Sequence, residues 1–234
     1  MRKTLMLAAL MMFSMLAHAQ YFCSAEGTKL HYVNYDDAGQ SVSNETTTVT
    51  RAVRANQQLN VQYITKIVTN KTKNNTSYSL TEWSYDGKKT VCTPDLMYGY
   101  YIADDRDPEK YDNVARTAMM EVKKFKGDNS FELLDGAKAG DAMPKRYYQY
   151  LKGMVTNEIN ITGAVYQGVE NVSTTGGRFD CLKISYNMRS KVVLKTRNYR
   201  VTEWYAKGVG LVKSETYTLE GQLAGKTVLT KIVR

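Results

Sequence analysis

A ten-residue segment that occurs twice places the strongest constraint on how this chain can fold. The second copy begins at Tyr199 and includes Thr202-Glu203-Trp204, and the first begins at Tyr78 and includes Thr81-Glu82-Trp83, so matched residues lie 121 positions apart. The only two Trp residues of the chain occupy matched positions in these copies. The repeat predicts an internal duplication that produces two similar β-units.

Most of the chain has the residue pattern of β-strands joined by short turns. In Thr28–Tyr35, Leu30 and Tyr32 alternate with His31 and Val33, which is the period of a strand. By alternation and β-propensity, further strands are expected over 46–55, 59–68, 154–162, 165–172, 179–187, 194–206, 210–218 and 226–233. This pattern predicts a mainly β fold, in which antiparallel curved sheets form an open barrel or a sandwich.

The middle of the chain has a different pattern. Asp107-Pro108 favours the start of a helix, and Val114 and Ala118 follow at helical spacing, so one short helix is expected to end near Met120. Further on, the Tyr-rich segment 147–151 fits either a short helix or a strand. A partly helical middle is therefore expected to join the two similar halves.

The first nineteen residues have the pattern of a secretory signal peptide. Arg2 and Lys3 precede the apolar run 5–16, which is too short to span a membrane as a helix, and Ala17-His18-Ala19 fits a cleavage site. We therefore expect export to the periplasm or the cell exterior, with cleavage before Gln20. No later apolar run approaches the length of a transmembrane helix.

The exported part, residues 20–234, is long enough for a single β-rich domain, with similar halves at about 27–100 and 154–234. Its formal charge is +7, because loss of Arg2 and Lys3 removes two charges from the +9 of the whole chain. The cations are dispersed along the sequence. This favours a solvated basic surface over a dedicated polyanion site, and no nucleic-acid partner is expected.

The exported part contains an odd number of cysteines, namely Cys23, Cys92 and Cys181. Export permits a disulfide, but at most one of the three possible pairings can form within the chain. The alternative is that all three pack in the core as small apolar residues. The sequence does not choose among these arrangements, and it leaves the oligomeric state open.

Residue types that dominate catalytic and metal sites are scarce. After residue 19 the chain has a single histidine, His31, which lies in an expected strand and is interpreted as an ordinary half-buried residue. The cysteines lack the spacing of a zinc site. The acidic segment 104–109 lacks the pattern of an EF-hand and is interpreted as a helix start. No catalytic, cofactor-binding or metal-binding residues are expected.

The repeated carboxylates, Glu82 and Glu203, resemble in number the pair that flanks the scissile bond in glycosidases. Duplication alone accounts for the pair. By alternation, Glu203 shares a strand face with Val201 and Tyr205, so it needs a partner that offsets its burial. A structural ion pair with Lys or Arg is favoured over an acid/base role.

Several segments resemble recurring segments of one protein family: Gly27-Thr28 with Tyr32 and Tyr35–Gly39, then Gly140–Pro144, Gly177–Ile184, Glu203–Glu215, the final hairpin through Gly221, and Leu229–Ile232. The family is the TapB-like, or DUF3108-like, family of exported Bacteroidetes proteins of unknown function. The resemblance covers most of the exported chain and is weakest between about 95 and 135. It implies a mainly β exported protein and supplies no established catalytic residues.

Three functions are compatible with these observations. The first is a non-enzymatic binding or interaction protein of the periplasm or cell envelope, whose partner is an unknown envelope protein or an apolar ligand. The second is a carrier that holds a lipid or another apolar ligand in a cavity of the sheet. The third is a carboxylate-based hydrolase, which requires Glu82 and Glu203 to lie within roughly 5–10 Å across one cleft.

Overall fold

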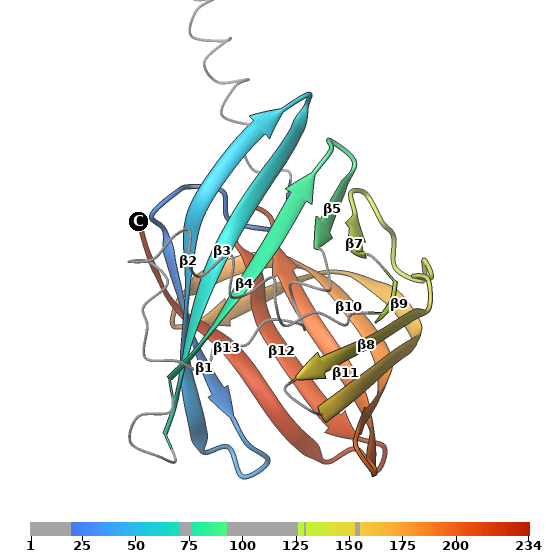
Figure 1. Cartoon of the computed structure of the whole chain (residues 1–234). Helices are drawn as coiled ribbons and strands as arrows, with labels where there is room; N and C mark the ends of the chain where they lie inside the picture. The colour runs from blue at the N-terminus through green and yellow to red at the C-terminus, as the bar shows by residue number, and fades with distance from the viewer. Residues whose placement is uncertain (1–19, 71–75, 93–125, 129, 153–154) are drawn as a thin grey trace, which may run out of the picture.

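Thirteen strands form one antiparallel sheet in the computed structural model, which describes residues 20–70, 76–92, 126–128, 130–152 and 155–234 (Figure 1). The order across the sheet is β6-β8-β9-β10-β11-β12-β13-β1-β2-β3-β4-β5-β7. The strands are β1 (Lys29–Tyr35), β2 (Ser41–Ala55), β3 (Gln58–Thr69), β4 (Thr76–Tyr85), β5 (Lys89–Cys92), β6 (Lys126–Gly127), β7 (Phe131–Leu134), β8 (Arg146–Lys152), β9 (Val155–Thr174), β10 (Gly177–Val192), β11 (Lys195–Ala206), β12 (Gly210–Thr218) and β13 (Leu223–Val233).

The sheet curls until strands that are distant in its order face one another (Figure 1). The ring centroid of Trp83, on β4, lies 6.5 Å from that of Tyr205, on β11, and the Phe131 ring of β7 lies 6.2 Å from the same Tyr205. We call the face that bears these rings the interior face, and the opposite one the outer face. Because side chains alternate along a strand, residues directly paired across the sheet share a face.

The predicted mainly β, antiparallel fold is confirmed. The edge strands β6 and β7 do not pair with each other in the described ranges, so the sheet is not closed, and neither a barrel nor a sandwich is confirmed. The expected helix after Pro108 lies outside the described residues, and the residues that are described contain no helix, membrane-spanning or otherwise. The segment 147–151, left open between helix and strand, belongs to β8.

The separate strands expected over 154–162 and 165–172 are wrong, because one twenty-residue strand, β9, covers both. Gly163 and Gly168 have positive φ, 61° and 92°, and each lies at a register shift between β9 and β10. Glycine adopts this conformation without a Cβ clash, so the two positions form bulges that bend the strand while the pairing continues on either side.

The segment Gln20–Cys23 connects strands from both halves of the sheet. The Gln20 carbonyl accepts a hydrogen bond of 2.8 Å from Gly208 in the β11–β12 turn, and the Tyr21 N–H donates one of 2.9 Å to the Thr90 hydroxyl on β5. The Cys23 carbonyl accepts a further hydrogen bond from the Tyr63 hydroxyl on β3. These bonds hold residues 20–23, which we call the lead-in segment, against one end of the curled sheet.

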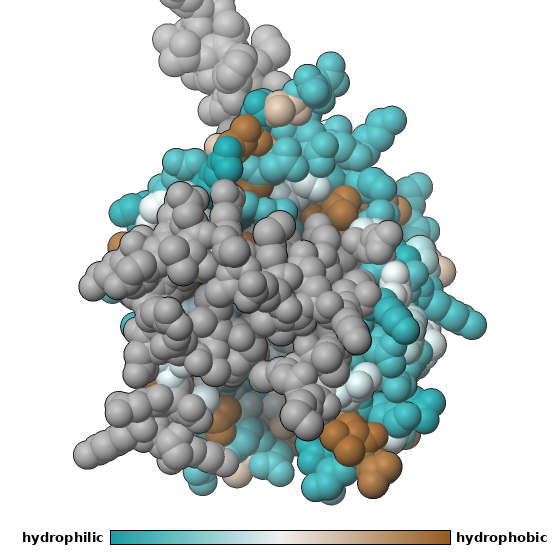
Figure 2. All heavy atoms as spheres, in the orientation of Figure 1, coloured by the Kyte–Doolittle hydropathy of each residue, from teal (hydrophilic) through white to brown (hydrophobic). Residues whose placement is uncertain are grey.

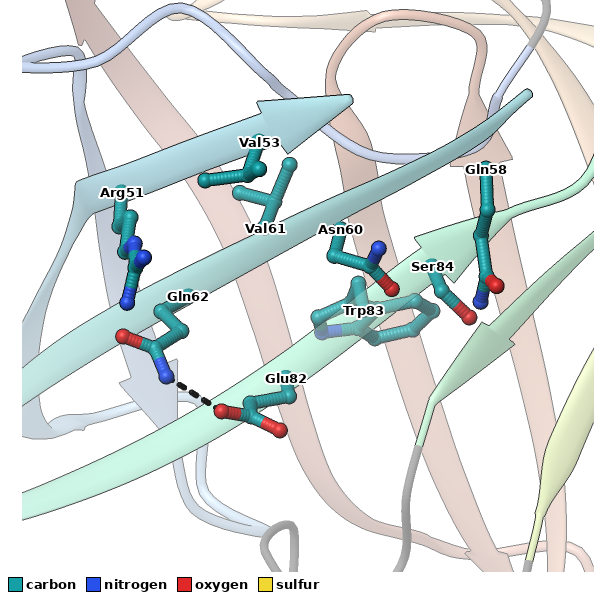
Figure 3. A pocket seen from close by; sticks show the side chains of 9 residues that line it. All are labelled: Arg51, Val53, Gln58, Asn60, Val61, Gln62, Glu82, Trp83 and Ser84. Carbon is teal, nitrogen blue, oxygen red and sulfur yellow. Dashed lines mark hydrogen bonds between the residues drawn. The ribbon is translucent and has the colours of Figure 1, made fainter. Parts of the chain in front are cut away.

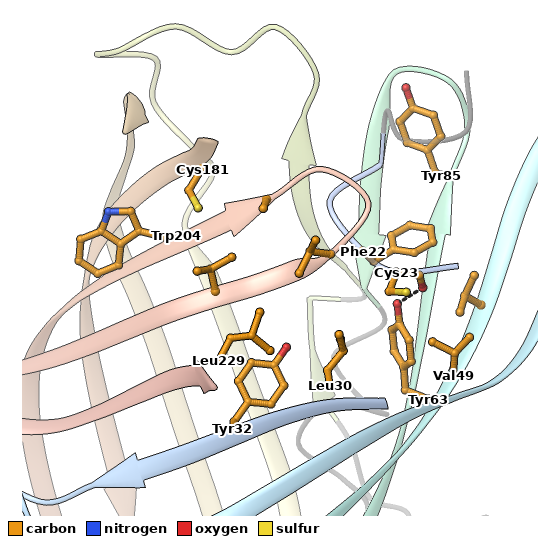
Figure 4. Close-up of a cluster of buried hydrophobic side chains, with 14 of the residues drawn as sticks. Phe22, Cys23, Leu30, Tyr32, Val49, Tyr63, Tyr85, Cys181, Trp204 and Leu229 are labelled. Carbon is orange, nitrogen blue, oxygen red and sulfur yellow. Dashed lines mark hydrogen bonds between the residues drawn. The ribbon is translucent and has the colours of Figure 1, made fainter. Parts of the chain in front are cut away.

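The largest core cluster contains side chains from the lead-in segment and from both halves of the sheet (Figure 4). Its best-buried members include Phe22, Val49, Val61, Val212 and Leu229. Cys23 and Cys181 belong to this cluster, and Cys92 to a neighbouring one. All three thiols are free and buried, so of the arrangements that the sequence left open the structure has the one in which the cysteines pack in the core.

Candidate functional site

A hollow of about 220 Å³ opens on the interior face between the β1–β4 strands and the β11–β12 turn. Its apolar lining comes from Phe22, Leu30, Ile67, Trp83 and Leu211, among others. Figure 4 shows Phe22, Leu30, Tyr32 and Tyr63 on the strands and the lead-in segment around this space. A concave, mainly apolar space with a few polar groups is the usual form of a small-molecule site.

Strand register explains why the hollow has an apolar side and a polar side. Leu30 and Tyr32 of β1 face the interior, and they pair directly with Thr47 and Glu45 of β2. The pairing continues from Thr47 to Thr65 on β3, and the two hydroxyls are 2.8 Å apart. A row of hydroxyls with one carboxylate therefore runs along the side of an otherwise apolar space.

Glu45 is the charged group of the hollow. Burial raises the pKa of its carboxyl, while hydrogen bonds from Asn34 and Thr47 oppose that rise. The Thr47 hydroxyl lies 3.5 Å from the carboxylate. A carboxyl with a raised pKa next to an apolar space is suited to meet a polar group of a ligand, in either protonation state.

Glu203 also faces the interior. It pairs with Ile184 on β10 and Ser214 on β12, and its carboxylate accepts a 3.0 Å hydrogen bond from the Tyr205 hydroxyl. Burial raises its pKa from 4.5 to about 7, against the opposing effect of hydrogen bonds from the Tyr205 and Tyr186 hydroxyls. The expected ion pair is wrong within the described residues, because tyrosine hydroxyls take the place of Lys or Arg.

Glu82 lies on the outer face, in a polar groove of about 410 Å³ along β2, β3 and β4 (Figure 3). Its carboxylate accepts a hydrogen bond from Gln62, its direct neighbour on β3. Arg51, Asn60 and Ser84 line the same groove. The structure therefore does not bring Glu82 and Glu203 together, since one points outward and the other inward.

The two tryptophans of the repeat also face opposite ways. Trp83 points inward, in contact with the rings of Phe22 and Tyr205. Trp204 lies on the face of β11 opposite to Tyr205, where it is buried in the largest core cluster (Figure 4), and the ammonium groups of Lys183 and Lys213 lie 5.2 and 4.6 Å from its ring centroid. The two copies of the repeated sequence thus form strands that present opposite faces to the interior.

The remaining residues considered from the sequence form no site in the described ranges. His31 accepts or donates one hydrogen bond with Thr46, at 3.1 Å, and burial together with nearby Lys231 and Lys29 lowers its pKa. His31 is thus a half-buried residue of β1, as its place in an expected strand predicted. No group of three His, Cys, Asp or Glu side chains with metal-binding geometry occurs among the described residues, and the acidic segment 104–109 lies outside them.

The carrier hypothesis expected a cavity in the sheet, but sequence reasoning missed Glu45 and the other residues that line the hollow. Glu45 directly precedes Thr46–Thr48, in a polar stretch where no residue type indicates a site. The available signal was the parity of Leu30 and Tyr32, because their pairing with β2 places Glu45 on the interior face. That pairing depends on the turn after Tyr35, whose register the sequence does not fix.

The fold is thus a single curled antiparallel sheet with an apolar hollow on its interior face. Two solved structures share the fold. One is assigned as an exported protein with a YmcC-like fold from Bacteroides fragilis (TM-score 0.69, 20% identity, covering 92% of this chain and 100% of that chain). The other is assigned as a lipoprotein from Parabacteroides distasonis (TM-score 0.71, 17% identity, covering 92% and 99%).

The DUF3108-like family model matches residues 25–229, nearly the whole described chain. The protein therefore belongs to the DUF3108-like family, as the resemblance of its segments predicted. A search of the curated proteins finds no match.

Proposed function

We propose that this protein is an exported, non-enzymatic binding protein of the periplasm or cell envelope, and that it holds the apolar part of a small amphipathic ligand in the interior hollow. The observation that supports the proposal is the hollow itself, where Phe22, Leu30 and Trp83 surround a space bordered by Glu45. The signal-peptide pattern of residues 1–19 supports the location.

The size of the hollow narrows the ligand class. About 220 Å³ is less than the roughly 300–1,000 Å³ that takes a drug-sized molecule, so a larger ligand extends beyond it. A single acyl chain or another slender apolar group fits this description. The hydroxyls of Thr47 and Thr65, with Glu45, supply hydrogen-bonding groups for a polar part of the ligand.

The hydrolase alternative receives less support. It requires two carboxylates across one cleft, and Glu82 lies in the outer groove while Glu203 faces the interior. The Glu82 carboxylate accepts a hydrogen bond from the Gln62 amide, and the Glu203 carboxylate accepts one from the Tyr205 hydroxyl. Both carboxylates are thus accounted for by contacts within the sheet.

The test uses Trp83 as an internal reporter. In a Trp204→Phe background, Trp83 is the only tryptophan, and it lines the hollow. A fatty acid with a conjugated polyene chain is titrated into the protein, and energy transfer from Trp83 is recorded. Saturable transfer is expected, because the bound chain lies beside the indole ring.

A matched pair of serine substitutions locates the binding. Ser79 lines the hollow and Ser84 lines the outer groove, on the same strand, β4. Ser79→Phe fills the hollow and is expected to weaken binding at least tenfold, while Ser84→Phe leaves it unchanged. Absence of saturable transfer, or equal binding by both variants, contradicts the proposed site.

A further inference from the structure

The turn between β10 and β11 exposes three consecutive apolar side chains. Val192, Val193 and Leu194 are 40%, 57% and 94% exposed, which makes Leu194 the most exposed large apolar residue of those described. In Figure 1 the β10–β11 hairpin ends at the lower right, and Figure 2 shows hydrophobic atoms protruding at that corner of the molecule. We call residues 192–194 the apolar tip.

The requirements of the fold do not explain this choice of residues. A two-residue hairpin turn favours Asn-Gly or a glycine, because it needs a left-handed conformation. Here Val193 occupies that position, with a φ of 54°, although its branched Cβ is poorly suited to it. Its N–H reaches only the Thr156 carbonyl, at 3.5 Å. The turn therefore carries apolar side chains at positions where glycine or asparagine would adopt the required backbone conformation at lower cost.

Cations surround the tip on both faces of the hairpin. Lys195 and Arg197 share one face, and Arg189 and Lys191 share the other, all within the last rungs of the β10–β11 ladder. The one carboxylate that β9 presents beside them is Glu158, which pairs with Lys191 at 3.5 Å. Asp37 and Glu220 line a hollow together with Arg197, so the four cations of the hairpin stand against three nearby carboxylates, and positive charge exceeds negative charge by one among these residues.

We infer that the apolar tip docks the protein on the surface of an anionic lipid bilayer. Apolar side chains enter the acyl boundary, and Lys or Arg residues beside them bind anionic headgroups. A stable protein interface buries at least about 1,000 Å², far more than a three-residue tip offers, whereas a bilayer accepts a small protrusion. This inference rests on the tip and its cations alone and does not depend on the hollow.

The test is co-sedimentation of the purified protein with vesicles. The protein is expected to sediment with phosphatidylglycerol vesicles at low salt, to remain in the supernatant with phosphatidylcholine vesicles, and to be released as salt is raised. Leu194→Asp should weaken binding to phosphatidylglycerol about tenfold or more, and Lys195→Glu about fivefold or more.

The control is Val169→Asp, which introduces the same charge at another exposed apolar position, 73% exposed on β9. It should bind vesicles as the unaltered protein does. Vesicle binding that is absent, or unchanged in Leu194→Asp, overturns the inference. Equal losses of vesicle binding in Leu194→Asp and Val169→Asp also overturn it, because the added negative charge alone then accounts for the weaker binding. Self-association that Leu194→Asp abolishes in light scattering, without vesicle binding, assigns the tip to a contact between copies instead.

Discussion

Replacing Glu203 with Gln is expected to stabilise the protein at neutral and alkaline pH. The carboxyl has a pKa of about 7 in the fold, compared with 4.5 ordinarily, because it is buried on the interior face. At about 1.4 kcal/mol per pH unit, this difference corresponds to about 3 kcal/mol. Between pH 4.5 and about pH 7, the folded protein keeps more of this carboxyl protonated than the unfolded chain does. The free energy of unfolding therefore falls as pH rises through that window.

Glutamine cannot ionise, and its carbonyl still accepts a hydrogen bond from the Tyr205 hydroxyl. Loss of the charged acceptor costs about 1 kcal/mol, so the variant should gain about 1–3 kcal/mol above pH 7 and nearly nothing at pH 4. Urea unfolding of both proteins across this pH range, followed by tryptophan fluorescence, measures the difference.

Glu82→Gln is the matched control, because it alters the equivalent carboxylate of the repeat on the outer face. It should show no comparable gain. A constant difference between Glu203→Gln and the unaltered protein from pH 4 to pH 8 would refute the reasoning, since burial would then not govern the ionisation of Glu203.

Two further predictions concern the core. Trp204→Ala should lower the free energy of unfolding by about 3–5 kcal/mol, because the ring is buried beneath Lys183 and Lys213, and Trp83→Ala by less, because that ring borders the hollow. Urea unfolding measures the loss of unfolding free energy in each variant, and a larger loss for Trp83→Ala than for Trp204→Ala contradicts the prediction. A thiol reagent should label three cysteines in denatured protein and almost none in native protein. Fast labelling of the native form contradicts their burial.

Local sequence pattern predicted much of the sheet. Alternation gave the position of β12 correctly and that of β11 to within one residue, because each is a regular strand with one buried face. It divided β9 in two at Gly163, since a glycine in a strand looks the same in sequence whether it forms a turn or a bulge. Only the partner strand distinguishes these cases.

The candidate site was much less predictable. The repeated Thr-Glu-Trp sequence suggested equivalent roles for Glu82 and Glu203. In the structure, however, β4 turns Glu82 to the outer face, whereas β11 turns Glu203 to the interior face. Which face turns inward is decided by register against neighbouring strands, over distances that residue pattern does not encode. The hollow arises from the curl of the whole sheet, so the pattern of no single segment predicts it.

The pairing of β1 with β13 has a consequence for how the molecule reaches its native state. Lys29 lies opposite Val233, so two central neighbours of the sheet come from the beginning and the end of the chain. The central contact therefore closes a loop of nearly the full chain length, which gives slow folding and a high contact order. The strands before β13 can pair locally during synthesis, but the two halves join only when β13 is available to pair with β1. A chain with this topology therefore stays incompletely folded until β13 has been synthesised.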